Sequence, residues 1–215
     1  MSWTRTQPLA LDPSAAAGVP GRGAAGAASA EGARVERGAA IETRRLKMRP
    51  VDAALARALH EDRAGAARLG GAILHRDFPD EDLSAMLATH AEELAAAPQW
   101  RPWGLWLVTY KPERMVVGAM GFQGPPDATG VVAIGYAIVA AHRRRGLATE
   151  GAAALIDWAF GDGGVGCVQA TCGADNMASI KLLSKLGFTL QGAPAPSETL
   201  RWLVTHSEWV RRRTV

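Results

Sequence analysis

A basic run is followed by small residues in one segment of the chain, His142-Arg143-Arg144-Arg145-Gly146-Leu147-Ala148-Thr149. Gly146 and Ala148 allow the backbone to approach an anion closely. A predicted strand precedes this segment and a predicted helix follows it, so main-chain amides and the positive end of a helix dipole would meet here. That chemistry suits a pyrophosphate group. The alternative is an ordinary strand-to-helix turn whose arginines lie in solvent, and the segment alone does not separate the two interpretations.

The spacing of the cysteines and histidines indicates neither a disulfide nor a metal site. Cys167 and Cys172, the only cysteines, are five residues apart, so on a strand they would point to opposite faces and would not bridge. We expect no disulfide and no metal, because no metal-ligand spacing links the histidines, which are His60, His75, His90, His142 and His206.

Several motifs, in this order, resemble those of the GNAT superfamily of acetyl-CoA-dependent N-acetyltransferases. Ile134-Gly135-Tyr136 is similar to the family's central strand, and Arg143-x-x-Gly146-x-Ala148, followed by Thr149-Glu150, to its acetyl-CoA signature. Asn176-x-x-Ser179 and Leu186-Gly187-Phe188 are similar to its closing helix and turn. Thr43-Arg44-Arg45-Leu46-x-x-Arg49-Pro50 further resembles the branch that includes the ribosomal-protein N-terminal acetyltransferases. The resemblance covers roughly residues 41–210.

The resemblance implies where acetyl-CoA, as co-substrate, would bind. The pantetheine arm would pair with the backbone around Ile138 and Val139 and would contact Asn176, and Ser179 would face the acetyl thioester. Lys181 is a candidate for the adenosine end, although a helix lysine is more often simply solvated. The pyrophosphate would bind main-chain amides of the run Arg143, Arg144, Arg145, Gly146, Leu147, Ala148 and Thr149.

The catalytic positions depart from the commonest family pattern. Many relatives have a glutamate where this chain has Ala133, and a tyrosine acid where it has Leu183. The N-terminal acetyltransferase branch suggests a different pair, Ser179 to assist the departing thiolate and Glu198 to accept the amine proton. Alternatively, Glu198 is a surface residue of its loop and Ser179 a packing residue.

The acceptor class is narrowed by an energy argument. Neutralising a lysine-like amine at pH 7 costs about 4.6 kcal/mol and an α-amine about 1.1 kcal/mol, so few candidate bases favour α-amines. Small amines are also possible acceptors. The acceptor cleft is expected to form from the first two helices, the segment 75–80 and a tryptophan-rich stretch, Trp100, Trp103 and Trp106. Asp77 and Asp80 either attract a cationic amine or form turns, and the tryptophans either pack in the core or form a recognition cage.

The elements that position these residues follow from hydrophobic periodicity. A strand is expected over 41–50, then a helix capped by Asp52 with a potential break at Gly65, and a helix over 83–97. Antiparallel strands at 105–110, 115–122 and 131–139 follow, then a helix at 146–160, a strand at 165–172, a helix from Asn176 to Gly187 and a strand at 200–205. The resemblance gives these elements a GNAT-like, three-layer α/β (α+β) fold with a central, mostly antiparallel mixed sheet flanked by helices.

Length and composition suit one globular domain, since the chain has 215 residues, 48% of them hydrophobic and 21% charged. Residues 1–40 are rich in alanine and glycine without periodicity, which predicts a disordered extension, whereas residues 41–210 form the predicted domain and 211–215 a basic tail.

The remaining function classes are constrained by charge and hydropathy. A net charge of +3 is too small to argue for nucleic acid binding. No apolar run approaches a membrane span and the start lacks a signal-peptide pattern, so we expect a cytoplasmic protein, monomer or homodimer. The predicted function is acetyl transfer to a primary amine. The alternative is a catalytically inactive acyl-CoA-binding sensor. It is suggested by Ala133 and Leu183, which stand where many relatives carry catalytic residues.

Overall fold

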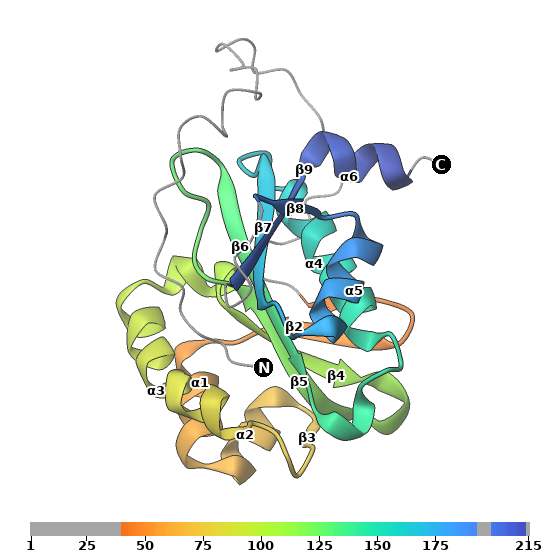
Figure 1. Ribbon diagram of the computed structural model, residues 1–215. Coiled ribbons are helices and arrows are strands. Elements are labelled where there is room, and N and C mark those ends of the chain that lie inside the picture. The colour runs from red at the N-terminus through yellow and green to blue at the C-terminus, as the bar shows by residue number, and fades with distance from the viewer. Residues whose placement is uncertain (1–39, 193–198, 214–215) are drawn as a thin grey trace.

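The structure is a computed structural model that describes residues 40–192 and 199–213 (Figure 1). Its strands are β1 (Ile41–Glu42), β2 (Leu46–Pro50), β3 (Ile73–Leu74), β4 (Leu105–Tyr110), β5 (Met115–Phe122), β6 (Val131–Ile138), β7 (Cys167–Gly173), β8 (Thr189–Gln191) and β9 (Thr199–Thr205). Its helices are α1 (Ala53–Glu61), α2 (Arg63–Gly70), α3 (Glu81–Ala96), α4 (Leu147–Phe160), α5 (Met177–Leu186) and α6 (His206–Arg213), with short 3-10 turns η1 (Pro98–Trp103), η2 (Lys111–Glu113) and η3 (Ala140–His142). The extension expected before residue 40 lies outside the described residues.

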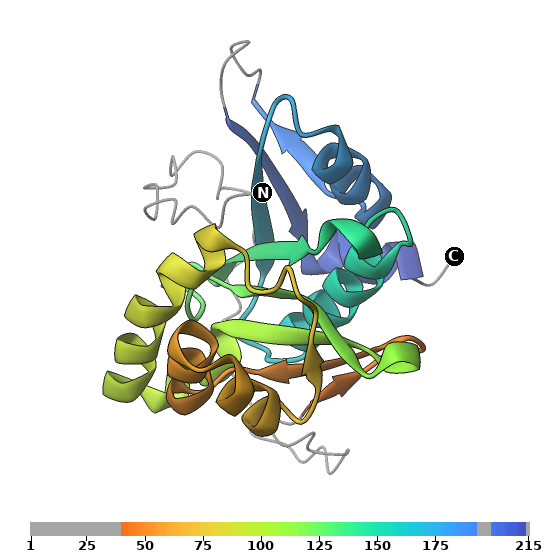
Figure 2. The ribbon, with the colours of Figure 1, turned by 90° about the horizontal axis from the view of Figure 1, so that it is seen from below.

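Helices cover both faces of one mixed sheet. The strand order is β1-β2-β4-β5-β6-β7-β9-β8, with β3 paired to β5. Helices α1, α2 and α3 lie on one face and α4 and α5 on the other (Figures 1 and 2). Among the described strands, β3–β5 and β6–β7 are parallel and the other pairs are antiparallel. The expected three-layer, mostly antiparallel mixed α/β fold is confirmed.

The N-terminal strand expected over residues 41–50 is instead a hairpin. Ile41 of β1 lies opposite Met48 of β2, and the amide of Thr43 donates to the carbonyl of Leu46 at 2.9 Å. The alternation of side chains continues across the turn, so the sequence pattern does not mark it.

The first predicted helix breaks at Asp62 rather than at Gly65. Asp52 caps α1 as expected, because its carboxylate accepts the amide of Leu55 at 2.9 Å. Asp62 ends α1 with its own amide and begins α2 by accepting the amide of Gly65 at 2.9 Å. Leu69, near the end of α2, is 47% exposed.

Strand β5 carries an irregularity beside the end of β6. Its register to β4 shifts between Val108 and Thr109, which leaves Val117 as the extra residue of a β-bulge. The next residue, Gly118, pairs with Ile138 of β6. A Cβ at Gly118 would overlap the carbonyl oxygen of Ala137 and lie 3.0 Å from Ile138 Cα. Glycine therefore permits the close approach of β5 to the end of β6.

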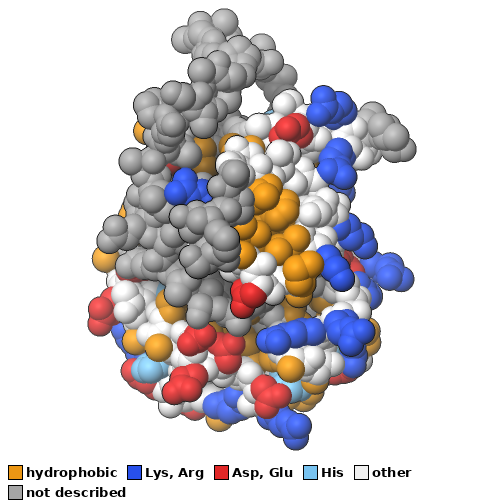
Figure 3. All heavy atoms as spheres, viewed as in Figure 1, with side chains coloured by type: hydrophobic (Ala, Val, Ile, Leu, Met, Phe, Trp, Pro, Cys, Tyr) orange, Lys and Arg blue, Asp and Glu red, His pale blue; other side chains and the backbone are white. Residues whose placement is uncertain are grey.

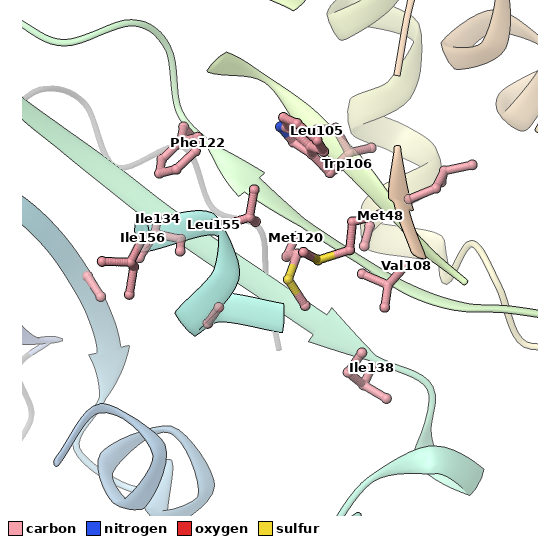
Figure 4. Packing of buried hydrophobic residues seen from close by; sticks show 14 of the residues in the cluster. Met48, Leu105, Trp106, Val108, Met120, Phe122, Ile134, Ile138, Leu155 and Ile156 are labelled. Carbon is pink, nitrogen blue, oxygen red and sulfur yellow. The ribbon is translucent and has the colours of Figure 1, made fainter. Parts of the chain in front are cut away.

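Helix α4 fixes the sheet to the second helical layer. Leu155 and Ile156 of α4 lie over Ile134 of β6, with Met48 and Met120 beside them (Figure 4). The ring of Trp158 contacts three others, with centroid distances of 4.8 Å to Trp103, 5.5 Å to Trp106 and 5.8 Å to Phe122. This packing fixes the C-terminal half of α4 against η1, β4 and β5.

Three regular elements were not predicted from the sequence pattern. Strands β3 and β8 span two and three residues, too short for a period-2 signal. Helix α6 is anchored by Trp209, whose indole nitrogen donates to Asp157 of α4 at 2.8 Å. The residues 211–213 of the expected basic tail form the last turn of α6 and are exposed.

Candidate functional site

The central feature of the site is the separation of two parallel strands. Strands β6 and β7 pair only from Val131↔Cys167 to Ala133↔Gln169. Beyond that point β7 stays paired with β9 along its whole length, while β6 stays paired with β5. Figure 2 shows β7 turning away from β6. The sheet is therefore unpaired between β6 and β7 beyond Ala133 and Gln169, and this unpaired stretch is called the opening below.

Main-chain groups of β6 face this opening. The amide of Val139 donates to Val117 at 2.9 Å and the carbonyl of Ala133 accepts from Gln123 at 3.0 Å, so odd-numbered residues bond β5. The alternating residue Tyr136 therefore turns its amide and carbonyl toward the opening, as does the carbonyl of Ile134, whereas the amide of Ile134 lies in the ladder to Gln169 of β7. These groups have the pattern that an extended, amide-containing ligand would continue.

The two residues predicted to pair with pantetheine have defined partners. The carbonyl of Ile138 accepts from Nε of Arg143 at 2.7 Å, and the amide of Val139 is bonded to β5. The structure places both residues at the wide end of the opening. Of the main-chain groups of these two residues, the amide of Ile138 faces away from β5, because alternate residues of the strand face the same side as Tyr136.

The predicted anion-binding segment follows directly. Arg144 has φ of 61° and Gly146 has φ of 75°, so the chain coils through two left-handed residues into α4. The amide of Glu150 makes the first helical bond, to Gly146 at 3.1 Å. The amides of Leu147, Ala148 and Thr149 precede it in the chain. They have no acceptor within the helix, because no helical residue lies one turn before them. They point out of the helix at its positive end, as an anion site requires.

The hairpin turn between β1 and β2 holds the other side of this segment. Thr43 Oγ1 donates to Glu150 Oε1 at 2.6 Å, and the amide of Arg45 donates to the same oxygen at 2.8 Å. The guanidinium of Arg45 donates to Glu150 Oε2 at 2.6 Å and to the carbonyl of Arg145 at 2.8 Å. Burial raises the pKa of Glu150, but these hydrogen bonds outweigh it and hold the pKa below its usual value.

A buried histidine supports the segment from below. His142 is 5% exposed, and its Nε2 lies 2.9 Å from Glu113 Oε2. Glu113 also lies 3.7 Å from Arg145, and the His142 ring contacts those of His75 and Tyr110. Its role here is packing under the turn, and no group of three or more metal-ligating side chains occurs among the described residues.

Helix α5 brings the predicted Asn176 and Ser179 to the same opening. Asn176 caps the helix, accepting the amide of Ser179 at 3.1 Å, which leaves its side-chain nitrogen as a donor. Ser179 is 3% exposed. Its side chain lies close to the hydroxyl of Tyr136 on β6. Burial raises the pKa of Tyr136 to about 12, although the neighbouring Ser179 lowers it.

Tyr136, to which the sequence pattern gave no role, lies beside Ser179. It was visible in the Ile134-Gly135-Tyr136 motif, but its contact with α5 depends on the packing of two distant elements. Leu183, at the position where relatives place a tyrosine acid, is buried in the core at 1% exposure. Lys181, the adenosine candidate, is exposed on α5. Glu198 lies outside the described residues.

The tryptophan-rich stretch divides between a pocket and the core. A pocket of about 270 Å³ lies between α3, η1 and the end of β5, lined in part by His90, Trp100, Trp103 and Gln123. Trp106 is fully buried instead, and its indole nitrogen donates to Pro102 at 2.9 Å.

The two aspartates near the predicted cleft differ in their contacts. Asp80 caps α3 by accepting the amide of Leu83 at 3.0 Å, as the turn-forming alternative anticipated. Asp77 is exposed, 3.7 Å from His75 and from Arg76.

The surface around the opening combines apolar and basic character. Figure 3 shows hydrophobic side chains gathered where β7 and α5 lie in Figure 1, with Lys and Arg side chains beside them. No helix in the described ranges is both long enough and apolar enough to span a membrane.

Comparison with known proteins identifies the family. The family model described as acetyltransferase (GNAT) domain matches residues 45–189. The uncharacterised N-acetyltransferase YjdG of Bacillus subtilis is 32% identical over 163 residues, which are 76% of this chain and 96% of YjdG.

Solved structures share the fold. The ribosomal-protein-S5-alanine acetyltransferase of Vibrio fischeri aligns with a TM-score of 0.59 at 16% identity, covering 80% of this chain and 98% of that one. RimL, a ribosomal L7/L12 alpha-N-protein acetyltransferase in complex with coenzyme A, aligns with a TM-score of 0.57 at 18% identity, covering 78% and 98%. These matches show the fold, and the family model and YjdG show that the chain belongs to the GNAT acetyltransferase family.

Proposed function

We propose that this acetyltransferase binds acetyl-CoA in the opening between β6 and β7 and transfers the acetyl group directly to a primary amine. The observation that carries the proposal is the juxtaposition of that opening with the free amides at the start of α4. The opening presents main-chain amides and carbonyls that can pair with the amides of the pantetheine arm. The start of α4 presents amide donors to a pyrophosphate. No other part of the described chain combines the two.

The donor set fits the chemical groups of CoA. The pyrophosphate would lie against the segment 143–149, and the pantetheine amides along Ile134, Tyr136 and the amide of Ile138. The nitrogen of Asn176 would meet the pantetheine, and Ser179 the thioester. The apolar patch with adjoining Lys and Arg side chains (Figure 3) supports this placement, because pantetheine is largely uncharged and the phosphates are anionic.

The reaction requires one bond to form and one to break. The lone pair of a neutral amine attacks the acetyl carbonyl carbon, the carbon–sulfur bond breaks with its electrons moving to sulfur, and the amine loses a proton. In our proposal Glu198, directly or through water, accepts that proton. The hydroxyl of Ser179 donates a proton to the thiolate and regains one from the protonated Glu198 through solvent, so the proton lost by the amine ends on the thiol. The product is an amide and free CoA thiol.

The acceptor is proposed to be an α-amine of a peptide or protein, or a small amine. An α-amine near pKa 7.8 requires about 1.1 kcal/mol to neutralise at pH 7, against about 4.6 kcal/mol for a lysine-like amine. The vacancy at Ala133 removes the commonest base, so the smaller cost favours the α-amine. That RimL and the Vibrio fischeri enzyme are ribosomal-protein acetyltransferases supports the same class.

The test is release of CoA thiol from acetyl-CoA with a panel of short peptides, amino acids and polyamines. We expect turnover with one acceptor class and none with Gly146→Glu, which puts a carboxylate at the left-handed residue of the anion site. Binding of acetyl-CoA without turnover on any acceptor would contradict the enzyme proposal and favour the sensor. Circular dichroism confirms that Gly146→Glu is folded.

The catalytic pair is tested separately. Ser179→Ala should lower kcat on the order of a hundredfold, as loss of a proton-transfer group does. Glu198→Gln should lower kcat and remove the acidic limb of its pH profile. An unchanged pH profile in Glu198→Gln shows that another group is the base.

A further inference from the structure

An acidic residue lies in the first turn of the helix that begins at the anion site. Glu150 follows the free amides of Leu147, Ala148 and Thr149, and its side chain is 19% exposed. A carboxylate there favours the helix dipole. It also opposes the binding of a second anion at the same terminus, because like charges in a partly buried place repel. A pyrophosphate site with an unpaired glutamate would be weakened by its own helix.

Arg45 is placed to remove this conflict. Its Nε donates to Glu150 Oε2 at 2.6 Å, in a pair where both side chains are about three-quarters buried or more. Its Nη1 donates to the carbonyl of Arg145 at 2.8 Å, and its Nη2 lies 3.5 Å from the position a Cβ of Gly146 would occupy. One guanidinium thus contacts the carboxylate, the segment and the N-cap of α4 together.

Thr43 completes the arrangement from the same turn. Its hydroxyl donates to Glu150 Oε1 at 2.6 Å, and it accepts the amide of Leu46 at 3.0 Å. The oxygens of Glu150 are therefore directed toward the β1–β2 turn, which lies over one hundred residues earlier in the chain. Both carboxylate oxygens of Glu150 are therefore held by hydrogen-bond donors of the hairpin.

We propose that Arg45 and Thr43 are positioning residues for acetyl-CoA: they neutralise and orient Glu150, so that the N-terminus of α4 accepts the pyrophosphate. This inference rests on the proposed function, because it assumes that the segment 143–149 binds CoA. It assigns a role to Thr43, Arg45 and Glu150, which belong to two motifs whose chemistry the resemblance leaves unstated. Neither residue is proposed to touch the reacting atoms.

The test measures the Kd of CoA by calorimetry for the wild type, Arg45→Met, Glu150→Gln and the double variant. Arg45→Met leaves the carboxylate without its cation and should raise Kd roughly tenfold. Glu150→Gln keeps an oxygen acceptor for Thr43 without the charge, and should bind CoA at least as tightly as wild type. The double variant should recover most of the affinity that Arg45→Met loses.

The matched control is Arg44→Met, which removes the same charge from an exposed residue one position away. It should change Kd by less than about threefold. In steady state, Arg45→Met should raise KM for acetyl-CoA and leave kcat near the wild-type value, since the reacting atoms are untouched. Urea denaturation of each variant reports its folding independently.

The outcomes separate this inference from the proposed function. A wild-type protein that does not bind CoA overturns the proposed function itself. Wild-type binding with an unchanged Kd in Arg45→Met overturns the inference alone. A double variant as weak as Arg45→Met, or weaker, shows that Arg45 acts only as a structural tie, and this also overturns it. Should Arg45→Met fail to fold, Glu150→Gln decides, because weaker CoA binding in that variant contradicts the charge argument.

Discussion

Replacing Gly118 by alanine tests whether the close approach of β5 to β6 positions the site. Gly118 is buried opposite Ile138, beside the bulge at Val117. An added methyl would overlap the carbonyl oxygen of Ala137 and lie 2.8 Å from Ile138 Cδ1 and 3.0 Å from Ile138 Cα. Two of these three atoms belong to the backbone, so a rotamer change does not relieve the overlap and β6 must move.

The expected cost follows from that geometry. Overpacking of a buried site costs about 1–3 kcal/mol, and for a domain of this size each kcal/mol lowers Tm by about 2–4 °C. Gly118→Ala should therefore melt roughly 2–12 °C below wild type. Because the carbonyl of Ile138 orients Arg143, the same shift should also raise KM for acetyl-CoA.

The assay is thermal unfolding followed by circular dichroism, with Gly166→Ala as the matched control. Gly166 is exposed and has no heavy atom within 4 Å of its would-be Cβ, so alanine there should leave Tm unchanged or slightly raised. If Gly118→Ala melts together with Gly166→Ala, the register and the close approach at the end of β6 are refuted.

The other predictions concern two titratable side chains of the sheet, Cys167 and Tyr136. Burial raises the pKa of Cys167 to about 11, so at pH 8 its thiol stays protonated and alkylation by iodoacetamide should be far slower in the folded than in the urea-unfolded protein; equal rates would contradict this. Tyr136, with a pKa of about 12 in the fold, stays protonated while the unfolded phenol ionises near pH 10. Its contribution to stability is thus present below pH 10 and is lost as pH rises through 12, on the order of 1 kcal/mol at pH 11. Urea denaturation should show a shallower alkaline loss in Tyr136→Phe, and identical slopes would argue against the buried phenol.

Local sequence signals predicted the elements that carry the site. The small residues of the proposed anion-binding segment stand between an apolar run and an amphipathic one, and the structure has the corresponding turn between β6 and α4. Asn176 and Gly187 bound α5 as expected, by side-chain capping and a left-handed residue. These features depend on neighbours within a few residues, which is why periodicity and capping rules reach them.

The features that were missed depend on distant contacts. The β1–β2 turn is held by Glu150, more than one hundred residues away, and no local pattern marks it. The contact of Tyr136 with Ser179 requires β6 and α5 to pack together around the opening. The resemblance indicated that Ala133 and Leu183 replace the catalytic residues of many relatives. It did not indicate that Tyr136 lies beside Ser179.

The most direct test of the central claim is a crystal structure of the protein with CoA bound. We predict density for the pyrophosphate against the amides of Leu147, Ala148 and Thr149, and for the pantetheine between β6 and β7, with the thiol near Ser179. CoA bound elsewhere, with the opening between β6 and β7 closed by protein, would contradict the account.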